Sequence, residues 1–172
     1  WEKRLWVPEY TATFVRHITL FKQSLPIHLD VALEWFTPHP TEALIAVARV
    51  TQDGLRIEYI GPRGTTPIPD LPTFSEVSAL EWSHEGTWLL VVGKSGGRTL
   101  ARIVATANNT PILALESLVA QPLTALTWDT TDDNQLAGYT KIGRGTILFI
   151  VNVKESTVAQ AILPEQSFGL PF

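Results

Sequence analysis

Residues 80–90 read LEWSHEGTWLL, an alternating stretch that ends in Trp82, a polar turn that contains Gly86, and a second apolar stretch. In the alternating part, Leu80 and Trp82 fall on one side and Glu81 falls on the other, which is the pattern of a β-strand with one buried face. A polar turn with glycine between two apolar stretches is typical of an antiparallel hairpin. We therefore predict two adjacent strands in this segment.

The alternating stretch occurs three times along the chain. It reads VALEW at 31–35, SALEW at 78–82 and TALTW at 124–128, so that the tryptophans are 47 and then 46 residues apart. A fixed period of this length is the sequence signature of a repeat architecture. We expect the shared positions to form an equivalent structural core in each repeat, made of Leu33, Trp35, Leu80, Trp82, Leu126 and Trp128.

Each repeat continues in the same way after its tryptophan, with a polar turn, a second strand, a connection that contains glycine, a third strand and a weaker fourth strand. The second strands are expected at 43–50, 87–92 and 135–139, the third at 55–60, 99–104 and 146–153, and the fourth near 67–74, 111–117 and 157–163. Twelve prolines spread along the chain interrupt most windows that are long enough for a stable helix. Four short antiparallel strands in every 46 or so residues predict an all-β fold made of β-propeller blades.

The repeats divide the chain into about three complete blades and a partial one within a single β-propeller domain. The expected boundaries are a partial blade at 1–25, blades at 26–75, 76–121 and 122–165, and a tail at 166–172. Propellers usually close with four to eight blades, so this number leaves open sheet edges. Three completions stay open: the tail closes a small ring, a second copy or partner chain completes it, or the molecule continues beyond this sequence, as the missing initial Met suggests.

The repeated pattern, which spans about residues 30–163 and is clearest at 80–90, resembles the repeats of WD40-like β-propellers. Such divergent repeats are also similar to the TolB-like and LpqB-like envelope propellers. Two departures are visible: no Gly-His pair precedes the repeats, and no Trp-Asp pair ends a third strand, since Trp128-Asp129 lies at the end of a first strand. The buried Asp-His-Ser/Thr-Trp network of regular WD40 blades is therefore not expected. The resemblance implies a non-catalytic scaffold for protein–protein interaction within a larger chain or complex. The alternative is an extracytoplasmic propeller domain that senses a ligand or binds a sugar.

Composition and charge exclude several classes of function. Thirteen Lys and Arg against 17 Asp and Glu give a net charge of −4, which offers no electrostatic footprint for nucleic acid. Cysteine is absent, which rules out disulfides and every thiol-based site. No apolar run is long enough to span a bilayer. The expected partner is a protein or further blades of the same chain. The compartment stays open between an exported protein and an intracellular complex subunit.

The candidate residues for chemistry are few. Asp129, Asp132 and Asp133 form the densest group of oxygen ligands and are candidates for a cation site, or for a loop whose side chains cap its own turns. His39 and His84 lie in the turns after the first strands of two repeats. Lys94 follows a glycine as in a phosphate-binding loop, but Trp88 stands where that motif needs another glycine, so a hairpin is expected. We therefore expect no catalytic residue, no cofactor and no enzymatic activity.

Overall fold

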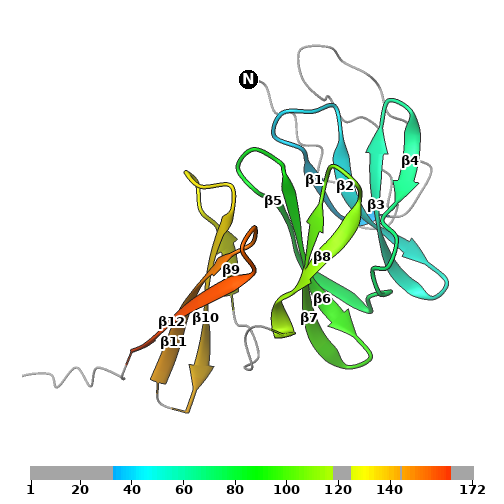
Figure 1. The fold of residues 1–172 in the computed structure, drawn as a ribbon. Coiled ribbons are helices and arrows are strands. Elements are labelled where there is room, and N and C mark those ends of the chain that lie inside the picture. Colours follow the sequence, from blue (N-terminus) through cyan, green and yellow to red (C-terminus); the bar gives the residue numbers. More distant parts are fainter. Residues whose placement is uncertain (1–32, 118–124, 144, 164–172) are drawn as a thin grey trace, which may run out of the picture.

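The computed structural model describes residues 33–117, 125–143 and 145–163, which form three four-stranded antiparallel sheets (Figure 1). Sheet 1 contains β1 (Leu33–Pro38), β2 (Ile45–Thr51), β3 (Gly54–Gly61) and β4 (Gly64–Pro67). Sheet 2 contains β5 (Glu76–Trp82), β6 (Trp88–Ser95), β7 (Arg98–Ala105) and β8 (Thr110–Ala114). Sheet 3 contains β9 (Ala125–Trp128), β10 (Gln135–Ile142), β11 (Gly145–Asn152) and β12 (Thr157–Leu163). The predicted all-β fold is confirmed.

Within each sheet, every strand pairs with its neighbour along the chain, so each sheet is a meander of hairpins. Between β6 and β7 the turn residues Gly96 and Gly97 have φ angles of 56° and 76°, and the flanking Ser95 and Arg98 are paired. Glycine adopts this left-handed conformation without steric cost, and it matches the twist of a two-residue hairpin. The glycine connection that the sequence predicts in this repeat is therefore a hairpin turn, and Lys94 lies in the strand before it.

Sheet 2 lies between the other two sheets and is buried on both faces (Figure 1). Along β6, Leu89 and Val91 pack in a cluster with residues of sheet 1, whereas Leu90 and Val92 pack in a second cluster with residues of sheet 3. A strand that is covered on both sides needs apolar residues at successive positions instead of alternating ones. The two clusters together form the core and hold the three sheets side by side.

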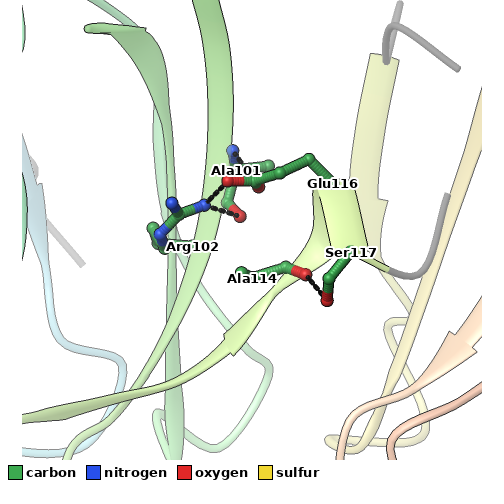
Figure 2. Close-up of polar contacts among 5 residues, drawn as sticks. All are labelled: Ala101, Arg102, Ala114, Glu116 and Ser117. Atoms are coloured by element: carbon green, nitrogen blue, oxygen red, sulfur yellow. Dashed lines mark hydrogen bonds and ion pairs between the residues drawn. The ribbon is translucent and has the colours of Figure 1, made fainter. Parts of the chain in front are cut away.

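Sheet 2 ends in a short 3-10 turn, Leu115–Ser117, where the sequence predicts the continuation of the fourth strand. Figure 2 shows the contacts that fix this turn: Glu116 forms an ion pair with Arg102 and accepts a hydrogen bond from the amide of Ala101 (3.3 Å), and the Ser117 hydroxyl donates to the carbonyl of Ala114 (2.6 Å). The turn places the fully buried Leu115 in the cluster between sheets 2 and 3.

No helix in the described part of the chain is long and apolar enough to cross a membrane.

The register of sheet 1 differs from the prediction at Trp35. Strand β1 continues past Trp35 to Pro38, with a register shift between Leu33 and Trp35. Consequently the residue of sheet 1 that is equivalent to Trp82 and Trp128 is Pro38. Pro38 pairs with Ile45 as Trp82 pairs with Leu89 and Trp128 pairs with Leu136. Trp35 is 40% exposed and does not share the core position of the other two tryptophans.

The predicted core position Leu33 has a side chain that lies outside the described part of the structure, and the other predicted core positions lie in or beside the two clusters. Leu80 and Trp128 are buried, and Trp82 and Leu126 are partly buried against the clusters. The fourth strand of sheet 1 lies earlier than the predicted 67–74, since β4 ends at Pro67 and only Phe74 bridges back to Leu55. The predicted partial blade at 1–25, residues 26–32 and the tail at 166–172 lie outside the described residues.

The corrected register predicts unequal effects of removing the three tryptophans. Trp82→Ala and Trp128→Ala should each lower the free energy of unfolding by about 3–5 kcal/mol, because each removes a large ring from a packed interface. Trp35→Ala should cost about 1 kcal/mol or less, as is usual for exposed positions. Urea unfolding of the three variants checks this, and equal losses at all three positions would restore the register expected from the sequence.

Candidate functional site

The contact between sheets 1 and 2 is organised around the side chain of Trp82. Its indole Nε1 donates a hydrogen bond to the carbonyl oxygen of Thr37 (3.1 Å). The ring stacks on Tyr59, with centroids 5.4 Å apart, and meets the edge of His39, with centroids 4.6 Å apart. Burial raises the pKa of Tyr59, so the phenol stays neutral at physiological pH. One residue of sheet 2 is thus held by three residues of sheet 1.

The contact between sheets 2 and 3 repeats this arrangement. The indole Nε1 of Trp128 donates to the carbonyl oxygen of Glu81, also at 3.1 Å. Glu81 precedes Trp82 in the chain just as Thr37 precedes Pro38, the residue that holds the equivalent position in sheet 1. A buried indole N–H needs an acceptor, and in both contacts the preceding sheet provides one.

The loops that follow the first strands, residues 39–44, 83–87 and 129–134, meet along one edge of the three sheets, which we name the loop edge. His39 joins the first two loops from a buried position. Its Nδ1 accepts hydrogen bonds from the amides of Thr41 (3.2 Å) and Glu42 (3.0 Å), and its Nε2 lies 3.0 Å from the carbonyl oxygen of Gly86. Because Nδ1 accepts and a carbonyl cannot donate, the imidazole is neutral and carries its proton on Nε2.

His84 does not share this environment. The residue of sheet 2 that corresponds to His39 is Ser83, since the amides of both donate across the start of their hairpins, to Leu44 and Trp88 respectively. His84 itself is exposed. The two histidines that the sequence placed in equivalent turns therefore have different surroundings, and His39 is a structural residue of the contact between sheets.

Asp133 joins the second and third loops. Its Oδ1 accepts a hydrogen bond of 2.6 Å from the amide of Glu85. Burial by itself would raise the pKa of Asp133, but hydrogen bonds from Ser83, Thr87 and the backbone of Glu85 outweigh it and hold the pKa below its usual value. The carboxylate is therefore ionised at neutral pH and links sheet 3 to sheet 2 at the loop edge.

The other two candidate cation ligands cap their own loop. Asp129 accepts hydrogen bonds from Thr131 and from the amide of Asp132, and Asp132 accepts them from Asn134 and Gln135. These bonds lower the pKa of both carboxyl groups. No group of three or more His, Asp or Glu side chains within 33–117, 125–143 and 145–163 could hold a metal ion. The geometry corresponds to the loop-capping interpretation of this cluster.

The outer face of sheet 3, remote from sheet 2, carries apolar side chains that nothing in the described structure covers. The term outer face refers here to six residues that the strand register brings together: Ala137, Tyr139, Leu148, Ile150, Ala159 and Ala161. Ile150 is 50% exposed and Leu148 is 41% exposed, and the three alanines are exposed beside them. A contiguous exposed apolar surface of this kind is typical of an interaction site in a soluble protein. Its alternation is visible in the sequence, but its lack of cover is not.

Asp133 predicts a pH dependence of stability. Because its pKa is lower in the folded chain than in the unfolded one, its contribution is present above the unfolded value of about 4 and is lost as the pH falls through the folded pKa. Asp133→Asn should therefore unfold at lower urea than the parent at pH 7, and the difference should shrink at pH 3. Equal urea midpoints of Asp133→Asn and the parent at pH 7 would contradict the link between the loops.

Gly86 provides a second test of the loop edge. Its φ is +85°, and a Cβ atom built on it would lie 2.3 Å from Nε2 of His39. Gly86→Ala should lower the free energy of unfolding by about 2–4 kcal/mol through backbone strain and displacement of the imidazole. Gly96→Ala, where φ is also positive but nothing lies within 4 Å of the added atom, should cost less. Thermal unfolding of both variants measures the difference, and a smaller loss at Gly86 would be inconsistent with the His39 contact.

No protein-family model matches this chain, and no curated protein is significantly similar to it. Its function is therefore inferred from the geometry of its own residues.

Proposed function

We propose that this chain is a non-catalytic scaffold of the β-propeller type, whose sheets act as blades and whose exposed surfaces bind other protein segments. The blade interpretation is supported by the two contacts between sheets, because each uses a tryptophan indole and a backbone carbonyl at corresponding positions. The meander order of each sheet and the repeat length agree with it. The divergent WD40-like resemblance of residues 80–90 points in the same direction.

A binding role without chemistry is supported by how the polar groups are used. His39 is engaged with backbone groups on both ring nitrogens, and the carboxylates of Asp129, Asp132 and Asp133 accept hydrogen bonds from their own or neighbouring loops. Groups that are committed to holding the loops together are poor candidates for proton transfer or ligand exchange. The loop edge therefore rigidifies the scaffold.

The single observation that carries the proposal is the outer face of sheet 3. Half-exposed Ile150 and Leu148 lie on an inner strand of a four-stranded sheet; Ile150 has Ala137 and Ala159 on its two sides, and Leu148 has Tyr139 and Ala161. Leaving such a face in water forgoes roughly 25 cal/mol for each Å² that could be covered. A protein surface that covers it gains this free energy, which is the physical basis of an interaction scaffold.

The proposal is tested with a dye whose fluorescence rises on exposed apolar surfaces. The parent chain should bind the dye in its native state, and Ile150→Lys should lower the fluorescence by about half or more without lowering the melting temperature. Val50→Lys is the matched control, because Val50 is exposed to the same extent on β2 of sheet 1. If Ile150→Lys leaves the dye fluorescence unchanged, the proposal is contradicted. If a small ligand raises the melting temperature of the parent chain, a ligand-binding module is favoured instead.

A further inference from the structure

We infer that the outer face of sheet 3 docks a further four-stranded antiparallel sheet, whose first strand ends in a tryptophan that donates its indole N–H to the carbonyl oxygen of Thr127. This inference rests on the proposed scaffold function and names the partner of its open face. Three features of the described residues lead to it: a series of acceptors, a series of equivalent apolar positions, and the state of the opposite end of the stack.

The first feature is the series of backbone acceptors. Thr37 in sheet 1 accepts from Trp82, and Glu81 in sheet 2 accepts from Trp128. The residue after each acceptor is paired with a residue of the neighbouring strand: Pro38 with Ile45, and Trp82 with Leu89. In sheet 3 the equivalent pair is Trp128 with Leu136. The third acceptor in the series is therefore the carbonyl of Thr127. Thr127 is exposed, and no described side chain donates to that carbonyl.

The second feature is the series of side chains that receive the next sheet. The strand register makes Tyr59, Ile103 and Ile150 equivalent. They lie opposite Ala46, Leu90 and Ala137, the residues that directly follow the equivalent Ile45, Leu89 and Leu136. Tyr59 is 2% exposed and stacks on Trp82, and Ile103 is fully buried in the cluster that contains Trp128. Ile150, the third member, is 50% exposed.

A second series behaves in the same way two residues away on the third strand of each sheet. Ile57, Ala101 and Leu148 lie opposite Ala48, Val92 and Tyr139. Ile57 and Ala101 are buried, whereas Leu148 is 41% exposed. Two neighbouring positions that are covered in both existing contacts are thus open in sheet 3 alone. The outer face has the side-chain pattern of a contact between sheets, with one partner missing.

The third feature argues against a second copy of this chain that stacks head to tail on the first. Sheets stacked head to tail would place sheet 1 of one copy on sheet 3 of another, through the face of sheet 1 that is remote from sheet 2. The side chains on that face, Ile45, Val47 and Ile60, are already buried within the chain. The partner is therefore not the first sheet of a second molecule, and the series of acceptors and of apolar positions favours another sheet of this repeat type.

The absence of cysteine makes the test direct, because a single introduced thiol reports its own exposure. We compare the rate of maleimide labelling of Ile150→Cys with that of Ile103→Cys, its buried equivalent, and of Val50→Cys, an exposed position elsewhere. In the parent chain the thiol at 150 should react about as fast as the thiol at 50. The thiol at 103 should react at least about tenfold more slowly, because it needs local opening.

The probe for docking is an extra sheet inserted into the chain directly after Leu163, ahead of residues 164–172. One extension repeats residues 118–163 after Leu163, and a second repeats residues 68–117, so that each supplies a first strand that ends in tryptophan. We expect either extension to slow labelling at position 150 by about tenfold while labelling at position 50 stays unchanged. Replacing the tryptophan of the added sheet with alanine should restore fast labelling.

Three results would overturn the inference. If neither extension protects position 150, this face does not receive a sheet of the repeat. If the added tryptophan can be replaced without loss of protection, the bond to Thr127 is not part of the contact. If the parent chain becomes protected as its concentration rises, the occupant is a second copy. Failure of the scaffold proposal looks different, because labelling at position 150 would then be as slow as at position 103 in the parent chain itself.

Discussion

The described structure depends on the need of a buried indole N–H for a hydrogen-bond acceptor. Trp82 and Trp128 each lie between two sheets, and each finds its acceptor in a backbone carbonyl of the preceding sheet at 3.1 Å. An indole that is held at one end by this bond and packed along its face fixes how far apart two sheets lie and how they are rotated. The stacking of Trp82 on Tyr59 and the burial of both faces of sheet 2 follow from that arrangement.

Much of the fold could be predicted because its signals are local. Alternation marks β5, continuous apolar residues mark β6, and glycines mark the turn between β6 and β7. The error at Trp35 arose because VALEW looks like SALEW while the strand that contains it runs three residues further. The number of residues between the first strand and the next apolar strand indicates the correct register. Trp82 precedes Leu89 by seven residues, as Pro38 precedes Ile45, whereas Trp35 precedes Ile45 by ten.

The site was harder to predict, because its properties depend on which surfaces meet. The alternation of Leu148 and Ile150 is readable in the sequence, but whether a sheet face is covered depends on its neighbours. Likewise, Asp133 belongs to an acidic cluster in the sequence, yet the amide that it binds lies 48 residues away on another loop. His39 is polar and sits in a turn, and only its bonds to Glu42 and Gly86 explain why it is buried.

The two indole bonds also have a direction: each runs from a later sheet to an earlier one. A carbonyl oxygen without its indole partner can still accept a hydrogen bond from water or from the neighbouring strand. An indole N–H that is buried before its acceptor is present would lose a hydrogen bond. Since a chain leaves the ribosome from its N-terminus, every acceptor is in place before its donor is made. The order of the sheets along the chain therefore makes each later sheet depend on an earlier one for its indole acceptor, and exchanging two sheets would leave the composition intact but reverse that dependence.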